Sequence, residues 1–267
     1  AACGKEGDGD SMNSCNKCDL VQYCNAACKK KHRHKHKKKC EKRVAELYDE
    51  KLFKEPPPPE DCPICFLPLP HDEAQILFES CCGKMICSGC CHADVYDNHG
   101  NIIVTKKCPF CRTPDPTSSE DIIKGLKKRM EVGDAYAFGM MGSYYSGGHY
   151  GLTHDRIKAL ECWHKAGKFG YTNLGNAYYN GDGVERDEKM ASHYHELAAM
   201  EGNVMARYNL GANECNAGNY DRALKHYMIA VRGGFTDSVK YIQQMYMNSD
   251  MQQKIITQML YDLIRCT

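Results

Sequence analysis

The cysteines of this 267-residue chain recur in pairs separated by two residues. Fifteen of the 18 cysteines lie in the first 111 residues, and the gap joins Cys15 to Cys18, Cys62 to Cys65, Cys87 to Cys90 and Cys108 to Cys111. Such a gap lets both thiolates of a tight turn face one ion at about 2.3 Å, and two such turns complete a tetrahedron. A disulfide framework, which is the alternative, has no reason to repeat this spacing. We therefore expect zinc as the cofactor.

The charge and hydropathy of the chain exclude several classes of protein. The formal net charge is +1 with 26% charged residues, so the whole-chain balance selects neither an acidic nor a basic partner. No apolar run approaches the roughly 18 residues of a membrane helix, and no signal peptide is visible, so we expect no membrane partner. An intracellular location, cytoplasmic or nuclear, is expected because thiols there stay reduced and free to bind metal.

Four consecutive prolines, residues 56–59, divide the cysteines into two groups. A proline run favours an extended and stiff polyproline II spacer that has no core of its own. We therefore predict two separate cysteine-rich modules, residues 1–40 and 60–113, on either side of a basic helix end and spacer at 41–59.

The second module resembles a RING finger over its whole length. The matching segments are Cys62-Pro-Ile-Cys65, Cys81-Cys82-Gly-Lys-Met-Ile-Cys87-Ser-Gly-Cys90 and Cys108-Pro-Phe-Cys111-Arg112. The resemblance implies two zinc ions held in a cross-brace. One ion would be held by Cys62, Cys65, Cys87 and Cys90, and the other by Cys81, Cys82, Cys108 and Cys111.

One position departs from the family pattern. The fourth ligand is often a histidine, but Lys84 stands where that histidine commonly lies, and a protonated lysine has no lone pair to offer. The adjacent thiols Cys81 and Cys82 supply the third and fourth ligands in an all-cysteine variant. Cys91 and His92 are the reserve candidates, with packing residues as the alternative interpretation.

The RING resemblance implies a surface that recruits a ubiquitin-conjugating enzyme charged with ubiquitin, without any covalent intermediate on this chain. Three residues match that surface: Ile64 within the first ligand pair, Pro109 within the last, and Arg112 after the final ligand. A planar guanidinium can donate to two carbonyl groups at once. The alternative interpretation of Arg112 is a solvated residue that follows a zinc knuckle.

The first module, residues 1–40, resembles a MYND finger, which is another two-zinc cross-brace. The matching ligands are Cys3, Cys15, Cys18, Cys24, Cys28, His36 and Cys40. The resemblance implies one zinc on Cys3, Cys24 and Cys28 and another on Cys15, Cys18, His36 and Cys40. The family's first cysteine would precede Ala1, so we expect the given sequence to lack it. With that ligand restored, the two fingers would hold two zinc ions each, four in total.

The stretch 29–39 contains eight Lys/Arg and three histidines. Among these histidines only His36 has the i, i+4 relation to Cys40 that places both on one helical face, so His32 and His34 are predicted to be surface residues. A basic run can bind nucleic acid or direct nuclear import, but this one has no interleaved aromatic residues for base stacking. We expect the solvated face of a helix, with nucleic acid an unlikely partner.

The composition changes after Cys111. Ser118 followed by Glu120 and Asp121 predicts a helix start, so residues 114–132 are predicted to form a linker helix. From residue 133 the chain repeats, and the recurring small and bulky positions are Gly142, Gly175 and Gly211, then Ala159, Ala191 and Ala223, then Trp163, His195 and Tyr227, then Ala166, Ala198 and Ala230. Small residues allow two helices to approach closely, and large ones fill the adjoining space.

The loop Tyr178-Tyr-Asn-Gly-Asp-Gly183 resembles that of Sel-one-like repeats, which are relatives of the tetratricopeptide repeat. The resemblance implies three repeats over about 133–232 in an all-α solenoid, followed by a capping region that reaches residue 267. Such solenoids bind peptides or other domains. Cys162, Cys215 and Cys266 are interpreted as buried thiols.

The predicted architecture is therefore two small cross-braced zinc-finger modules followed by an all-α helical-repeat solenoid. The function expected from the resemblances is a RING-type ubiquitin-protein ligase, whose partners are a conjugating enzyme, ubiquitin, and a substrate bound by the solenoid and MYND finger. The alternative is a non-enzymatic protein-interaction scaffold, which Lys84 and the lack of the tryptophan frequent before the last ligand pair support.

Overall fold

The structure is a computed structural model that describes residues 13–23, 26–70, 75–93, 95–96, 99–103 and 107–248. The chain divides into two units, Ala1–Lys54 and Glu55–Thr267. Cys3, Cys24, Cys266 and the predicted cap at 250–265 lie outside the described residues. In the described part of the chain, no helix is both long enough and apolar enough to span a bilayer.

The described residues of the first unit form a two-stranded hairpin and one long helix. Strand β1 (Asn13–Ser14) pairs antiparallel with β2 (Gln22–Tyr23), and α1 covers Ala26–Leu52. Lysine, arginine, glutamate and alanine dominate α1, and these residues have high helix propensity. Within the basic run only His36 is buried, so its lysines and arginines form a solvated helix face as expected.

The second unit begins with the second cysteine-rich module. Strand β3 (Ile76–Glu79) pairs antiparallel with β4 (Lys84–Cys87), with Glu79 opposite Lys84 at the turn. A one-turn helix α2 (Ser88–Cys91) follows, and β5 (Val95–Tyr96) pairs with β6 (Ile102–Ile103). The core of the module is small: Cys62, Leu69 and Ile86 are buried. A core of this size needs additional cross-links, such as metal ions, to hold a fold.

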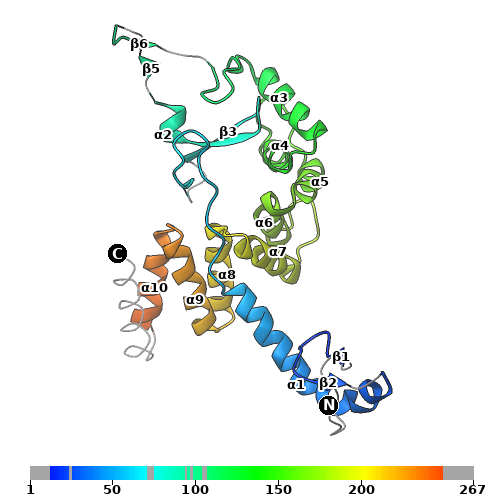
Figure 1. Ribbon diagram of the computed structural model, residues 1–267. Helices are drawn as coiled ribbons and strands as arrows, with labels where there is room; N and C mark the ends of the chain where they lie inside the picture. The colour runs from blue at the N-terminus through cyan, green and yellow to red at the C-terminus, as the bar shows by residue number, and fades with distance from the viewer. Residues whose placement is uncertain are drawn as a thin grey trace. The chain divides into compact units, whose positions relative to one another are not determined.

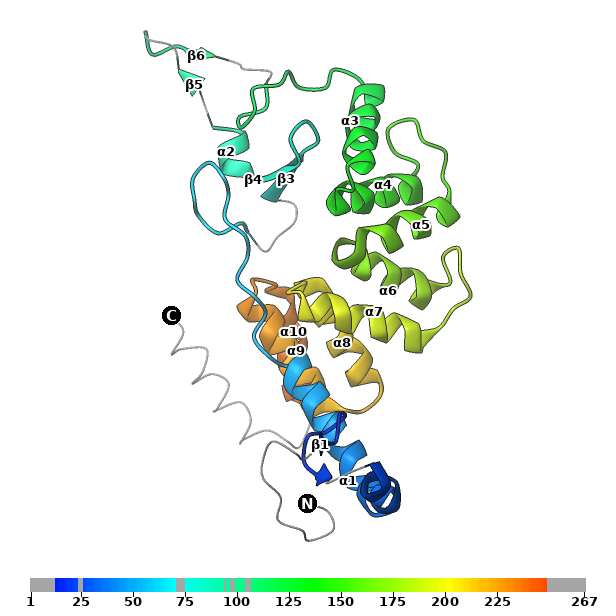
Figure 2. The same ribbon diagram turned by 45° about the vertical axis from the view of Figure 1, so that its right-hand side comes forward.

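The remainder of the second unit is a stack of helices (Figure 1). These helices are α3 (Ser119–Glu131), α4 (Ala135–Gly147), α5 (Arg156–Ala166), α6 (Tyr171–Asn180), α7 (Glu188–Met200), α8 (Val204–Asn216), α9 (Tyr220–Arg232) and α10 (Asp237–Asn248), with the short 3-10 helix η3 (Gly167–Phe169) before α6. Figure 2 shows α4 with α5, α6 with α7, and α8 with α9 as successive hairpins. The observed architecture confirms the expected fold class.

Side-chain caps define where several of these helices begin. The Ser118 hydroxyl accepts from the backbone N–H of Asp121 at 3.1 Å, as the sequence predicts for the start of α3. Asp134 likewise accepts from the first turn of α4. Such caps satisfy helix N–H groups that have no partner within the helix, and each stabilises its helix by about 1 kcal/mol.

The recurring small and bulky residues meet within each hairpin. In every case a glycine of the first helix lies against a ring of the second, in the pairs Gly142 with Trp163, Gly175 with His195, and Gly211 with Tyr227. A β-carbon at these glycines would come within 2.6, 2.6 and 2.7 Å of the facing ring. The alanines that recur with them in the second helices are at most 1% exposed. The predicted small-against-large packing is therefore confirmed.

The second cysteine-rich module packs directly against the first helices of the helical stack. Phe78 of β3 contacts the buried cluster that contains Leu126 and Met141, and its ring centroid lies 4.7 Å from that of Tyr136. The predicted linker helix α3 buries Ile123 and Leu126 between the two. The partner of α3 thus comes from a strand that lies far away in the sequence.

The proline spacer also contacts the helical stack. An oxygen of Glu55 accepts from the guanidinium of Arg232 at 2.6 Å, and Pro56 lies against Gly202 in the α7–α8 connection. The ion pair is largely exposed and contributes little to stability.

Candidate metal centres

Three of the cysteine pairs adopt the same turn. In each pair the residue after the second cysteine has a left-handed backbone and donates its N–H to the carbonyl of the first cysteine. These hydrogen bonds join Asp19 to Cys15 at 2.9 Å, Phe66 to Cys62 at 2.9 Å and Arg112 to Cys108 at 3.0 Å. In the third turn, the backbone N–H of Cys111 also donates to Cys108 Sγ at 3.5 Å. The local sequence thus forms three tight turns, here called knuckles, and each presents two cysteine thiols as possible metal ligands.

Centre 1 contains Cys15, Cys18, His36 and Cys40. The first knuckle supplies two ligands, and one face of α1 supplies the others four residues apart. Cys18 Sγ lies 3.2 Å from His36 Nε2, and Cys15 Sγ lies 3.8 Å from Cys40 Sγ. The ring of Tyr23 packs edge-on to His36, with their centroids 6.2 Å apart. His32 and His34 lie outside the cluster.

Centre 2 contains Cys62, Cys65, Cys87 and Cys90. The second knuckle faces the end of β4 and the helix α2, where Cys87 and Cys90 lie. Cys65 Sγ and Cys87 Sγ are 3.8 Å apart. The β3–β4 hairpin thus carries a distant cysteine pair back to the knuckle.

Centre 3 contains Cys81, Cys82, Cys108 and Cys111. The β3–β4 turn supplies two thiols and the last knuckle supplies two, with Sγ separations of 3.3 Å for Cys81 to Cys111 and 4.0 Å for Cys82 to Cys108. Along the chain the ligand pairs of centres 2 and 3 alternate. The structure therefore brings together the interleaved sets that the RING resemblance implies.

The spacing within the centres fits zinc. In each centre the donor atoms all lie within 4.8 Å of one another. A tetrahedron with zinc–sulfur bonds of about 2.3 Å has sulfur–sulfur edges of about 3.8 Å, whereas a disulfide needs about 2.05 Å. The cysteines of all three centres are free thiols. Sulfur-rich donor sets in tetrahedral arrangement favour zinc over harder ions.

One thiol in each centre is favoured as thiolate by the protein itself. The backbone N–H of Lys17 and then that of Cys18 lower the pKa of Cys15 to about 6, despite burial. Burial raises the pKa of Cys62, but hydrogen bonds from backbone N–H groups outweigh burial and lower this pKa to about 6. The Thr113 hydroxyl and backbone lower the pKa of Cys111 to about 6. A thiolate is the form that binds metal.

Four other thiols of these centres have a raised pKa. Burial and neighbouring thiols raise the pKa of Cys40 to about 11 and that of Cys90 to about 12. Burial raises the pKa of Cys82 to about 11, and burial and hydrogen bonds to Cys111 and Cys108 raise that of Cys81 further. The three thiols of centre 1, or the four of centre 2 or 3, cannot all ionise without a compensating charge, which a dication supplies.

The reserve ligands lie outside the centres. Cys91 Sγ lies 3.9 Å from an oxygen of Glu79, and burial and that carboxylate raise the pKa of Cys91. His92 is exposed. The ammonium of Lys84 lies over the Phe110 ring at 5.8 Å from its centroid, so Lys84 packs beside centre 3 as a cation–π partner.

The predicted second centre of the MYND-like module cannot be assembled from the described residues. Cys28 is described and packs on the cluster of centre 1, whereas Cys3 and Cys24 lie outside the described part. The assignment of a zinc ion to Cys3, Cys24 and Cys28 stays a prediction.

The residues matched to a conjugating-enzyme surface lie on the second and third knuckles. Ile64 and Pro109 are half-buried and Arg112 is exposed. Three further apolar side chains that the sequence reasoning missed are exposed on the same turns: Phe66 at 76%, Leu67 at 64% and Phe110 at 44%. Their sequence signal is their position within a ligand pair or one to two residues after it.

Comparison with known protein families finds one match in the first unit and another in the helical stack. The family described as MYND finger matches residues 1–40, and the family described as Sel1 repeat matches residues 136–168 and 169–203. The chain thus has one segment similar to a MYND finger and two segments similar to Sel1 repeats. The MYND match agrees with the metal-binding arrangement of centre 1, and the Sel1 matches agree with the helical hairpins of the stack.

Two curated relatives are similar over part of the chain. Chitin synthase regulatory factor 4 of Schizosaccharomyces pombe is 29% identical over 130 residues, which is 47% of this chain and 20% of that protein. The ERAD-associated E3 ubiquitin-protein ligase component HRD3B of Arabidopsis thaliana is 36% identical over 87 residues, 32% of this chain and 14% of that protein. The chain spans a fifth or less of the length of either relative.

Two solved structures also resemble the chain. A Sel1 repeat protein from Oxalobacter formigenes is 26% identical, with a TM-score of 0.46 over 53% of this chain and 60% of that one. The c5321 protective antigen of uropathogenic Escherichia coli, which displays an SLR fold, is 25% identical, with a TM-score of 0.45 over 49% of this chain and 30% of that one.

Proposed function

We propose that residues 60–113 form a RING-type finger and that the chain is a zinc-dependent ubiquitin-protein ligase. The observation that carries this proposal is the interleaving of centres 2 and 3, with both knuckles carrying exposed apolar side chains. A metal-braced module with apolar residues on its surface is suited to docking a partner protein. The partner proposed is a ubiquitin-conjugating enzyme charged with ubiquitin.

The chemistry proposed is positional. Ile64 and Pro109, with Phe66 and Phe110 beside them in the sequence, form the apolar contact with the conjugating enzyme. The Arg112 guanidinium donates hydrogen bonds to carbonyl groups of enzyme and ubiquitin together. Holding a flexible thioester in one orientation raises the rate of attack by a substrate lysine, with no covalent bond to this chain. Zinc acts structurally, because it holds the knuckles in place.

The other modules would select substrates. The MYND finger binds proline-containing peptides in this proposal, and the helical stack binds a second segment of the substrate. The similarity to the Arabidopsis ERAD-associated ligase component supports a connection with ubiquitin transfer. We place the protein in the cytoplasm or nucleus, where free thiols bind zinc. With both MYND ions present it would hold four zinc ions.

A second candidate is a scaffold whose fingers only bind partners. The observation that favours it is Lys84, which stands at the usual histidine position and packs on Phe110. The chain's single tryptophan is Trp163 in the repeats, so the tryptophan frequent near the last RING ligands is absent.

An autoubiquitination assay of the zinc-loaded chain with a panel of conjugating enzymes separates the two candidates. The ligase proposal expects ubiquitin chains with at least one enzyme and their loss in the Ile64→Ala and Arg112→Ala variants. Lys107→Ala, an exposed residue of the same finger, is the control and should retain activity. Silence across the panel with full zinc content supports the scaffold.

A further inference from the structure

The three centres differ in how far their thiols are open to solvent. The cysteines of centre 1 are at most 9% exposed, and those of centre 2 are buried or half-buried. In centre 3, by contrast, Cys81 and Cys111 are both exposed. No other cysteine in the described ranges is exposed. A dissolved reagent therefore reaches centre 3 more easily than either of the other two centres.

The two exposed thiols also face each other. Cys81 comes from the β3–β4 turn and Cys111 from the last knuckle, and their Sγ atoms lie 3.3 Å apart. A disulfide bond is about 2.05 Å long, so a small approach of the two sulfurs is enough to form one. Thiols that sense oxidants are accessible to solvent and lie beside a second thiol that closes the disulfide. This pair has both properties.

Helix α3 holds the turn that carries the first of these thiols. A β-carbon on Gly125 of α3 would lie 2.7 Å from Oγ of Ser80. The guanidinium of Arg129, also in α3, packs over Gly83. Asp134 fixes this guanidinium, because its carboxylate accepts from Nε at 2.9 Å and from Nη2 at 2.7 Å. Ser80 and Gly83 flank the two cysteines of the turn, so the exposed thiol is held in place.

Bound zinc makes access to solvent the property that separates the centres. A cysteine that binds zinc does so as a thiolate, so the ligands of all three centres are then in the reactive form. The oxidation of thiolates follows their exposure. We therefore expect centre 3 to be oxidised before centres 1 and 2.

We propose that Cys81 and Cys111 form a redox modification site at which hydrogen peroxide causes centre 3 to release its zinc ion. One thiolate attacks a peroxide oxygen, so that a sulfur–oxygen bond forms, the oxygen–oxygen bond breaks and hydroxide leaves. The second thiolate attacks that sulfur, so that the disulfide forms, the sulfur–oxygen bond breaks and a second hydroxide leaves. The two sulfurs lose two electrons, and the peroxide, with two protons from the buffer, becomes two water molecules. Centre 3 keeps two thiolates and releases zinc as the dication.

Release of this ion would act on the proposed ligase surface. The last knuckle carries Pro109 between its two ligands and Arg112 directly after them. Without the metal this knuckle loses a constraint on its position, so oxidation should lower the ligase activity, and a thiol reductant with zinc should restore it. This consequence rests on the proposed function, whereas the oxidation itself needs only the zinc of centre 3.

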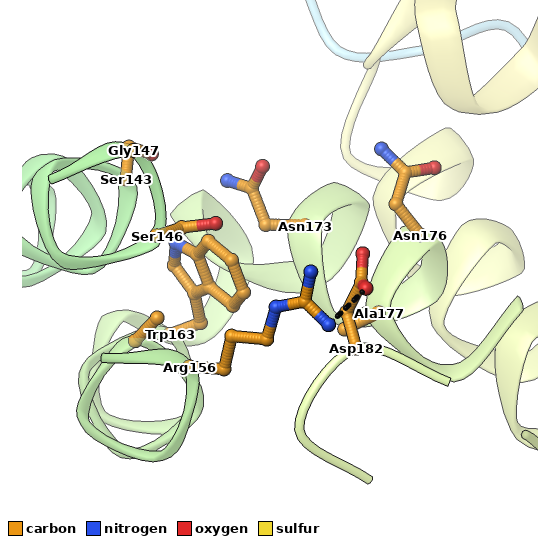
Figure 3. A pocket seen from close by; sticks show the side chains of 10 residues that line it. Ser143, Ser146, Gly147, Arg156, Trp163, Asn173, Asn176, Ala177 and Asp182 are labelled. Atoms are coloured by element: carbon orange, nitrogen blue, oxygen red, sulfur yellow. Dashed lines mark ion pairs between the residues drawn. The ribbon is translucent and has the colours of Figure 1, made fainter. Parts of the chain in front are cut away.

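The described part of the helical stack offers the oxidant no exposed thiol. A hollow of about 320 Å³ opens between its first two hairpins, and none of the described residues that line it is a cysteine (Figure 3). Carboxamides there, such as that of Asn176, which accepts from Nδ2 of Asn209 at 3.3 Å, are not oxidised by peroxide. Cys162 is 8% exposed and Cys215 is half-buried.

The test treats the zinc-loaded full chain with hydrogen peroxide, follows zinc release with a chromogenic chelator and maps the disulfides by mass spectrometry. Centre 3 should lose its ion as the disulfide between Cys81 and Cys111 forms, about tenfold or more faster than centres 1 and 2 lose theirs. A thiol reductant with added zinc should reverse the change.

Two variants sharpen the test. Cys81→His keeps a donor for zinc but has no thiol at this position, so its centre 3 should release zinc about tenfold more slowly. Cys91→Ala removes a half-buried thiol outside the centres and is the control, which should behave as the wild type. Should the histidine variant bind no zinc, the disulfide map of the wild type decides the question by itself.

Three results would overturn the inference: the first disulfide joins cysteines of centre 1 or 2, the three centres lose zinc at one rate, or zinc-loaded Cys81→His loses the ion of centre 3 as fast as the wild type. The measurement contains no conjugating enzyme and no ubiquitin. Failure of the redox site therefore leaves the ligase proposal intact, and an inactive ligase leaves the oxidation measurable, so the two failures are distinguishable.

Discussion

The backbone of Gly142 in α4 lies directly against the indole of Trp163 in α5. A β-carbon at residue 142 would stand 2.6 Å from Cδ1 and Nε1 of that ring and 3.0 Å from the carbonyl oxygen of Ala159. Gly175 faces His195 and Gly211 faces Tyr227 in the same way, so each hairpin closes on one glycine and one ring.

Gly142→Ala should therefore destabilise the first hairpin. Overpacking costs about 1–3 kcal/mol, which exceeds the helix-propensity gain of about 1 kcal/mol that alanine otherwise brings. Denaturant unfolding measures the difference. In a Trp163→Phe background, Gly142→Ala should destabilise the protein less, because the smaller phenylalanine ring leaves room for the added β-carbon. Additive costs in this double-mutant cycle would contradict the proposed contact.

The buried ring of His195 predicts a pH dependence of the helical stack. Burial lowers its pKa to about 4 from an ordinary value of 6.5. The unfolded chain therefore binds the proton more readily, so the stability is full above pH 6.5 and falls as the pH decreases toward 4. At pH 5 the loss is about 2 kcal/mol.

The measurement is the difference in free energy of unfolding between pH 7.5 and pH 5 for the wild type and His195→Phe. Phenylalanine is the matched substitution, because the other two hairpins carry Trp163 and Tyr227 at this position. The variant should lose about 2 kcal/mol less than the wild type. An equal loss in both proteins would show that His195 does not titrate on unfolding.

Metal content should follow the three observed centres. Cys82→Ala and Cys108→Ala should each reduce the zinc content by one ion per chain, because a three-thiol site binds weakly. Cys91→Ala, adjacent to a ligand but outside the centres, should leave it unchanged. Elemental analysis with thiol titration gives the answer. Loss of zinc in Cys91→Ala, or none in Cys82→Ala, would require a different ligand set.

Zinc removal should also loosen α3. Phe78 comes from a strand that centres 2 and 3 hold in place, and it packs on Leu126 and Tyr136. Chelation should therefore raise the rate of amide hydrogen exchange in both cysteine-rich modules and in α3, while the amides of α8 and α9 stay protected. Phe78→Ala should weaken α3 alone with zinc retained. An unchanged rate of amide hydrogen exchange in α3 after chelation would show that the second cysteine-rich module does not stabilise the helical stack.

Local spacing explains why much of this site could be predicted. A ligand pair such as Cys62 with Cys65 is fixed by its own turn, and the i, i+4 relation of His36 to Cys40 by its helix. The packing of Phe78 on α3 could not be predicted, because it joins residues about 50 positions apart without a sequence pattern. The Asn176–Asn209 contact likewise depends on how two hairpins stack.

The proposed ligase activity can be measured directly as the single-turnover discharge of ubiquitin from a loaded conjugating enzyme. Ubiquitin loaded on a conjugating enzyme is transferred to free lysine with and without the zinc-loaded chain. The chain should increase the rate of this transfer by about tenfold or more, because it restrains the thioester, and Arg112→Ala should abolish the increase. No increase with any enzyme of a panel, while zinc content is complete, would contradict it.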